Sequence, residues 1–86
     1  MPLISRFYGI RIIMYYRDHN PPHFHAKYGE YEATFDLLSS ELLTGRLPER
    51  ANRLVQTWAI KYRMELQSNW LLALLNQPLQ RIEPLE

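Results

Sequence analysis

Hydrophobic and polar residues alternate over much of the first half of the chain, a pattern that is typical of β-strands. Residues 5–17 are rich in Ile, Tyr and Phe and predict one long strand, in which Gly9 marks a bulge or bend. Residues 31–37 alternate strictly and predict a strand with one wet face. Residues 23–28 predict the strand that pairs with it, as a hairpin turned at Gly29. The buried face of the first strand is expected to comprise Tyr8, Ile10, Ile12, Met14 and Tyr16.

The hydrophobic period changes from two to about 3.6 residues after Pro48, a residue that favours the first turn of a helix. Nothing in the sequence breaks this helix before Pro78. Residues 38–47 predict a connection with a short strand near Leu42, and residues 80–84 predict a short strand or an extended tail. The helix stripe expected to face the sheet is Ala51, Leu54, Val55, Trp58, Tyr62, Leu66 and Trp70.

These elements predict an α+β fold in a single domain, residues 1–86. A small antiparallel sheet of three to four strands is expected to pack on one long C-terminal helix, followed by a short extended tail. The chain is 47% hydrophobic and 22% charged and has no cysteine, so disorder and a disulfide framework are not expected. Neither a membrane helix nor a signal peptide is recognisable, and we expect a soluble cytoplasmic protein.

A second apolar stripe lies on another side of the predicted helix, at Ile60, Met64, Leu71 and Leu75. A narrow sheet does not cover two stripes, so these residues predict contact with a small protein partner or a second copy of the chain. The alternative is that the sheet and the tail together cover them.

The net charge is only +1, although two basic segments, residues 1–28 and 50–63, flank an acidic one. Ordinary solvated faces are the favoured interpretation of this pattern. The alternative is nucleic-acid binding without chemistry through Arg6, Arg11, Arg50 and Arg53.

All three histidines fall within residues 18–29, DHNPPHFHAKYG. In the structural interpretation, this segment is a stiff turn that leads into a strand. Phe24 and Ala26 then point into the core, while His23 and His25 lie on the opposite face.

Two chemical interpretations compete with the structural one. His23 and His25 on one strand face, completed by Asp18, His19 or a carboxylate of a neighbouring strand, would suit a divalent metal, Zn or Fe. Alternatively, the two histidines act as acid and base and Lys27 holds a phosphate, as metal-free RNA cleavage requires.

Residues 18–26, DHNPPHFHA, resemble the hallmark of a bacterial family catalogued as domain of unknown function 4160. Leu47-Pro48, a helix with Trp58-Ala59 and Asn69-Trp70, and the ending at residues 82–85 are similar to the same family. The resemblance implies a small bacterial protein without an assigned activity, sometimes half of a toxin–antitoxin-like gene pair. We therefore predict a protein-interaction or binding module. The alternative is a toxin-like RNA-cleaving or metal-dependent hydrolytic enzyme that uses the two histidines of the PPHFH core.

Overall fold

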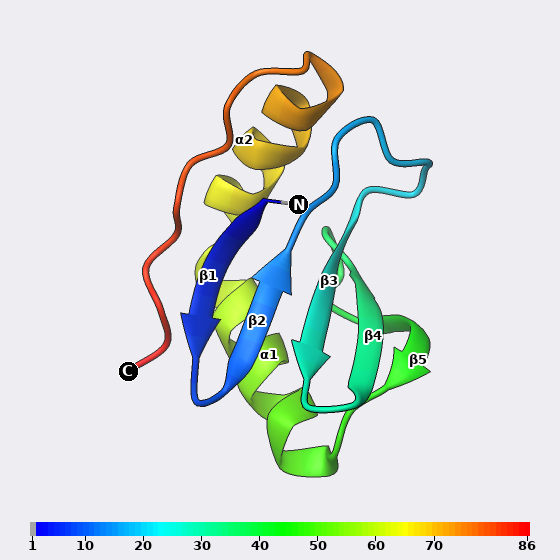
Figure 1. The fold of residues 1–86 in the computed structure, drawn as a ribbon, viewed down its shortest axis with the longest axis vertical. Coiled ribbons are helices and arrows are strands. Elements are labelled where there is room, and N and C mark those ends of the chain that lie inside the picture. Colours follow the sequence, from blue (N-terminus) through cyan, green and yellow to red (C-terminus); the bar gives the residue numbers. More distant parts are fainter. Residues whose placement is uncertain (1) are drawn as a thin grey trace.

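The computed structural model describes residues 2–86 and contains one antiparallel sheet, two helices and an extended tail (Figure 1). The five strands lie side by side in chain order. They are β1 (Leu3–Phe7), β2 (Ile10–Ile13), β3 (His23–Tyr28), β4 (Tyr31–Asp36) and β5 (Leu42–Arg46), and the helices are α1 (Glu49–Lys61) and α2 (Arg63–Leu74). The predicted α+β class is confirmed, but the sheet has five strands and the helical region is divided in two.

The predicted long strand over residues 5–17 is wrong, because the chain reverses direction at Tyr8 and Gly9. Both residues have positive φ, 50° and 80°, which matches the two-residue turn that suits the twist of a hairpin. Gly9 is therefore the turn rather than a bulge within one strand. As a consequence, Tyr8 and Tyr16 are exposed, and only the central residues of the predicted buried face lie in the core.

The predicted helix is interrupted at one residue, Tyr62, which separates α1 from α2. The backbone hydrogen bonds continue around it, from Tyr62 N–H to Trp58 O and from Leu66 N–H to Tyr62 O. No proline or glycine lies at this position, so the sequence does not predict the break. The core stripe is confirmed nonetheless, with Trp58 and Leu66 fully buried on either side of it.

Both helices pack against the same face of the sheet, and the tail runs alongside β1 (Figure 1). The core lies between them and includes Phe24 and Phe35, whose rings stack 5.5 Å apart. The tail is extended, as predicted, and Ile82 N–H donates to Ile4 O across 2.8 Å. Within residues 2–86, no helix is long and apolar enough to cross a membrane.

The second apolar stripe of the helices is exposed in this chain. Neither the sheet nor the tail covers it, and 59–78% of each residue is accessible: Ile60, Met64, Leu71 and Leu75. Arg50 and Arg53 lie on α1, whereas Arg6 and Arg11 lie on strands whose polar positions face away from the helices. The four arginines of the nucleic-acid hypothesis therefore do not share one surface.

Candidate metal centre

The histidine cluster lies on the face of the sheet opposite the core, with Trp70 of α2 packed against His23. β3 alternates, so that Phe24 and Ala26 enter the core while His23 and His25 project from the other face, as predicted. The segment between β2 and β3, which includes a cis peptide bond before Pro21, folds back over this face. It carries Asp18 to the two histidines.

One carboxylate oxygen of Asp18 meets both histidine rings. Oδ2 lies 3.0 Å from His23 Nε2 and 3.3 Å from His25 Nε2. These three residues form a group whose ligand atoms all lie within 4.8 Å of one another. The two Nε2 atoms and the carboxylate therefore converge on one point from two segments of the chain.

The hydrogen bonding of His23 fixes which of its nitrogens can bind a cation. Nδ1 lies 2.7 Å from the carbonyl oxygen of Pro21, and a carbonyl can only accept, so Nδ1 carries the proton. In the neutral ring, Nε2 then presents its lone pair to the Asp18 carboxylate. Two lone pairs at 3.0 Å repel each other unless a cation lies between them or the ring is protonated.

His25 differs, because its hydrogen bond is made by Nε2, to the Asp18 carboxylate. Its Nδ1 is buried without a hydrogen bond, and the nearest acid is Glu32, whose Oε2 lies 3.5 Å away. The Tyr15 ring packs edge-on against the imidazole at 4.6 Å between centroids and restricts its orientation. A carbonyl or a carboxylate behind the distal nitrogen is the usual support of a histidine that ligates a metal.

The distances from Asp18 Oδ2 to the two Nε2 atoms match the ligand spacing around one metal ion. Metal–ligand bonds of about 2.1 Å place neighbouring ligand atoms about 3.0 Å apart in an octahedral site and about 3.4 Å apart in a tetrahedral one. The two distances from Asp18 Oδ2, 3.0 and 3.3 Å, match these values. Two imidazoles and one carboxylate, without thiolates, suit Zn²⁺ or Fe²⁺.

Asp18 is a carboxylate at neutral pH. Partial burial raises its pKa, but the hydrogen bond from His19 N–H and the contacts with His25 and His23 outweigh burial, so the pKa lies below its usual value. A ligand to a divalent cation must be deprotonated, and Asp18 meets this requirement without further change.

A pocket of about 460 Å³ opens beside the cluster. One wall is the β2–β3 segment, and the other is formed by Thr34, Leu43 and Thr44 of β4 and β5. The two threonine hydroxyls hydrogen-bond to each other at 2.7 Å. The volume is within the range that holds small organic ligands, so a metal at the cluster would face a space that admits a substrate.

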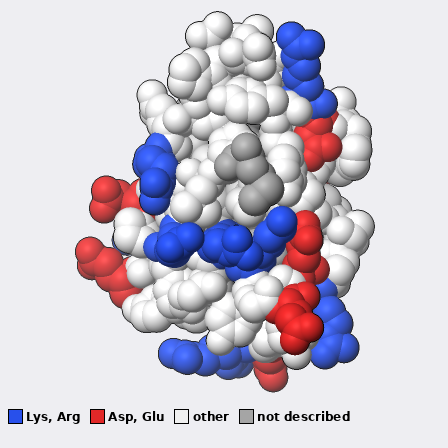
Figure 2. Space-filling model, in the orientation of Figure 1, with Lys and Arg blue, Asp and Glu red and all other residues white. Residues whose placement is uncertain are grey.

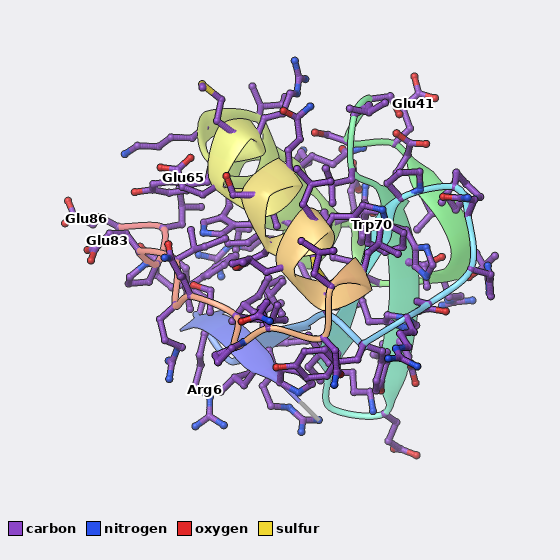
Figure 3. The ribbon with its side chains drawn as sticks, turned by 90° about the horizontal axis from the view of Figure 1, so that it is seen from above. Arg6, Glu41, Glu65, Trp70, Glu83 and Glu86 are labelled. Atoms are coloured by element: carbon purple, nitrogen blue, oxygen red, sulfur yellow. The ribbon has the colours of Figure 1, made fainter. Side chains whose placement is uncertain are left out.

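Trp70 packs against His23 of the cluster. It projects from α2 toward the strands (Figure 3), and its ring centroid lies 5.6 Å from that of His23. His23, whose ring also contacts His19, His25 and Asp18, is only 4% exposed. Trp70, a member of the core stripe of the helices, therefore contacts the candidate site as well as the core.

Not every residue predicted for the site joins the cluster. The His19 ring stacks on His23 at 5.2 Å, but its side chain is 82% exposed and it is not one of the converging ligands. Lys27 lies on the same face as His25 but outside the pocket wall. The strand alternation alone could have indicated Glu32 and Thr34, because both lie on the predicted wet face of residues 31–37.

Comparison with known proteins supports the resemblance read from the motif. The model of a family described as "Domain of unknown function (DUF4160)" matches residues 9–71, which include the whole DHNPPHFHA segment. No curated protein and no solved structure matches the chain.

Proposed function

The chain belongs to the DUF4160 family, and we propose that this member is a divalent-metal-binding domain. Asp18, His23 and His25 would hold a Zn²⁺ or Fe²⁺ ion beside the pocket that they help to line. The observation that carries this proposal is the pair of Nε2 atoms aimed at one carboxylate oxygen while the Nδ1 of His23 donates to a backbone carbonyl. That is the hydrogen bonding of a metal-ligating histidine.

The proposed site belongs to the open class of metal centres. Three protein ligands leave at least one position for water or substrate, whereas structural zinc sites are closed by four protein ligands. A bound divalent ion lowers the pKa of its water toward neutrality, which is the chemistry of metal-dependent hydrolysis. The hydrolytic hypothesis therefore follows from the metal hypothesis, and the chain supplies a pocket in which a substrate would meet that water.

Metal titration of the purified, metal-free protein tests the proposal. We expect Zn²⁺ to bind with one ion per chain by calorimetry and to shift the Nε2 resonances of His23 and His25 together. Asp18→Asn and His25→Ala should abolish tight binding, whereas His19→Ala should retain it, because His19 is exposed and outside the ligand group. Glu32→Gln should weaken binding by less than about 10-fold, since the Glu32 carboxylate is half exposed and lies 3.5 Å from His25 Nδ1 without a hydrogen bond.

The opposite result has a clear structural meaning. If the histidine ring signals do not respond to Zn²⁺ or Fe²⁺, the contacts of His23 with Pro21 O and Asp18 serve the fold, and the segment is a structured turn. Equal loss of binding in the His19→Ala variant would also contradict the proposed ligand set.

A second function is favoured by the exposed apolar stripe of Ile60, Met64, Leu71 and Leu75. We propose that it contacts a small protein partner or a second copy of the chain, as expected of an interaction module or of half a two-gene pair. Sedimentation over a range of concentrations tests the second copy. Self-association that is lost in Leu71→Lys, with folding unchanged, supports it. A monomer at every concentration excludes the second copy as the partner.

A further inference from the structure

A row of basic side chains crosses the open face of the sheet beside the histidine cluster. The strand register places Arg6 opposite Arg11 and Arg11 opposite Lys27, on β1, β2 and β3. Figure 2 shows Lys and Arg side chains lying across the middle of this face. We call Arg6, Arg11 and Lys27 the basic row. Sequence separates its members widely, and only the pairing of three strands brings them together.

The basic row has no internal counter-charge. Among residues 2–86, none of its three side chains makes an ion pair. Glu32 is paired with Lys27 in the register, but its carboxylate lies beside His25. Like charges directly opposite each other on neighbouring strands are destabilising, and an external anion would relieve this repulsion.

The basic row borders the pocket of the candidate metal centre. Lys27 and His25 are two residues apart on one strand face, which separates their Cα atoms by about 6.6 Å. The next row of the register contains Ile13, His25, Thr34 and Thr44, of which the last three line the pocket. A ligand with an anionic group on the basic row would therefore extend into the pocket.

We propose that the open face binds a short segment of single-stranded nucleic acid. Its phosphates lie on the basic row, where guanidinium groups bind phosphate oxygens bidentately, and one nucleoside enters the pocket. The pocket offers threonine hydroxyls for hydrogen bonds and Leu43 and Pro21 as apolar walls. Binding itself depends only on the row and the pocket, while presentation of a phosphodiester to a metal rests on the proposed function.

Charge and shape favour a short single strand over other polyanions. Glu32 follows the row on β4, and the tail beside β1 carries Glu83 and Glu86, so the positive surface is only about 10 Å long at strand spacing. That length spans two or three phosphates, which fits a chain with a net charge of only +1. A base reaches the pocket only if it is unstacked, as in single strands.

Fluorescence anisotropy with a short labelled oligouridylate, measured in EDTA, tests the proposal without any metal. We expect the logarithm of the association constant to fall linearly with the logarithm of the salt concentration. Three phosphate contacts predict a slope of about −2. Arg11→Gln/Lys27→Gln should lose at least about 10-fold in affinity and reduce the slope by more than about 1. The control Arg53→Gln/Arg63→Gln has the same charge change on the helices and should stay within about twofold.

Three results would overturn the proposal. They are absence of binding at low salt, equal loss in the control pair, and competition by uridine monophosphate as effective as that by the oligonucleotide. The melting temperature of each variant shows that the fold is retained. Because EDTA removes metal, failure here and failure of the metal titration are independent results.

Discussion

Gly45 lies inside β5. Its φ is +72°, and a Cβ on it would clash with the carbonyl oxygen of Glu32 on β4. Gly45→Ala therefore combines a left-handed backbone with a collision between two strands, and we expect it to cost about 3 kcal/mol of unfolding free energy or more. Urea denaturation followed by circular dichroism measures this cost.

Gly29 is the matched control for this substitution. It also has positive φ, +58°, but a Cβ there meets nothing within 4 Å. Gly29→Ala should therefore cost only the backbone term, about 1–2 kcal/mol. An equal loss of unfolding free energy at the two positions would show that the close approach of Gly45 to β4 does not affect stability.

Asp36 stabilises the turn after β4. Its Oδ1 accepts from Leu38 N–H and Ser39 N–H, each at 2.8 Å, and the Ser39 bond is the main reason that its pKa lies below 3.8. A carboxyl whose folded pKa is depressed contributes its full stability above the unfolded pKa and loses it as pH falls through the folded value. The contribution of Asp36 should thus begin to fall near pH 4, the unfolded pKa, and be lost once the pH is below its lower folded pKa.

Two substitutions at Asp36 separate charge from hydrogen bonding. Asp36→Asn keeps an acceptor, so its unfolding free energy should depend less on pH below about pH 4 than that of the unmodified chain. Asp36→Ala removes the acceptor and should cost about 1–2 kcal/mol at neutral pH. Urea midpoints measured across the acid range provide the test. Identical pH profiles for the unmodified chain and Asp36→Asn would contradict it.

The C-terminal tail is fastened to the helices by side-chain hydrogen bonds. Asn69, which is 1% exposed, donates to Gln80 O at 2.8 Å and accepts from Gln80 N–H at 2.9 Å. Trp58 Nε1–H donates to Glu83 O at 2.8 Å. These bonds take the place of a strand ladder, which explains how an extended segment stays in position with one backbone bond to β1.

Asn69→Ala should release the tail without unfolding the sheet. Two hydrogen bonds at about 0.5–1.5 kcal/mol each predict a loss of about 1–3 kcal/mol. Hydrogen exchange of the Gln80 and Ile82 amides should accelerate, while that of β3 and β4 stays slow. Ser68→Ala, an exposed neighbour, is the control. Unchanged exchange at Gln80 would mean that the tail is held by apolar packing alone.

The elements that sequence predicts well are those with a strong local pattern. Residues 23–28 and 31–37 alternate around Gly29, and the structure has this hairpin at β3 and β4. The sequence does not predict the first hairpin, because apolar residues continue on both sides of Tyr8 and Gly9. The spacing of hydrophobic residues alone does not distinguish two short strands from one long strand. The helix break at Tyr62 has no local pattern at all.

At the scale of the whole molecule, the candidate site draws on segments that sequence reasoning connects only partly. Alternation predicts that His23 and His25 share a face, and turn chemistry places Asp18 nearby. Contact of Trp70 with His23 depends on how α2 crosses the sheet, which no local pattern encodes. The pocket also needs β5, whose strand was expected only near Leu42.

Because the site joins the β2–β3 segment, β3 and α2, metal binding should stabilise the entire fold. A ligand at about 100 times its dissociation constant adds about 2.7 kcal/mol if it binds only the folded chain. For a domain of this size that raises the melting temperature by about 10–20 °C. Differential scanning calorimetry with Zn²⁺ should show this rise, and EDTA should reverse it.

The His25→Ala variant distinguishes the proposed centre from binding elsewhere. This variant removes one ligand but keeps the contact between His23 and Trp70, so the fold should persist. The rise in melting temperature produced by Zn²⁺ should disappear. His19→Ala should keep the full rise, since the ring of His19 is exposed. A rise of equal size in His25→Ala would place the ion outside the cluster. The β2–β3 segment would then be a structured turn whose histidines serve the fold through Pro21 and Asp18 alone.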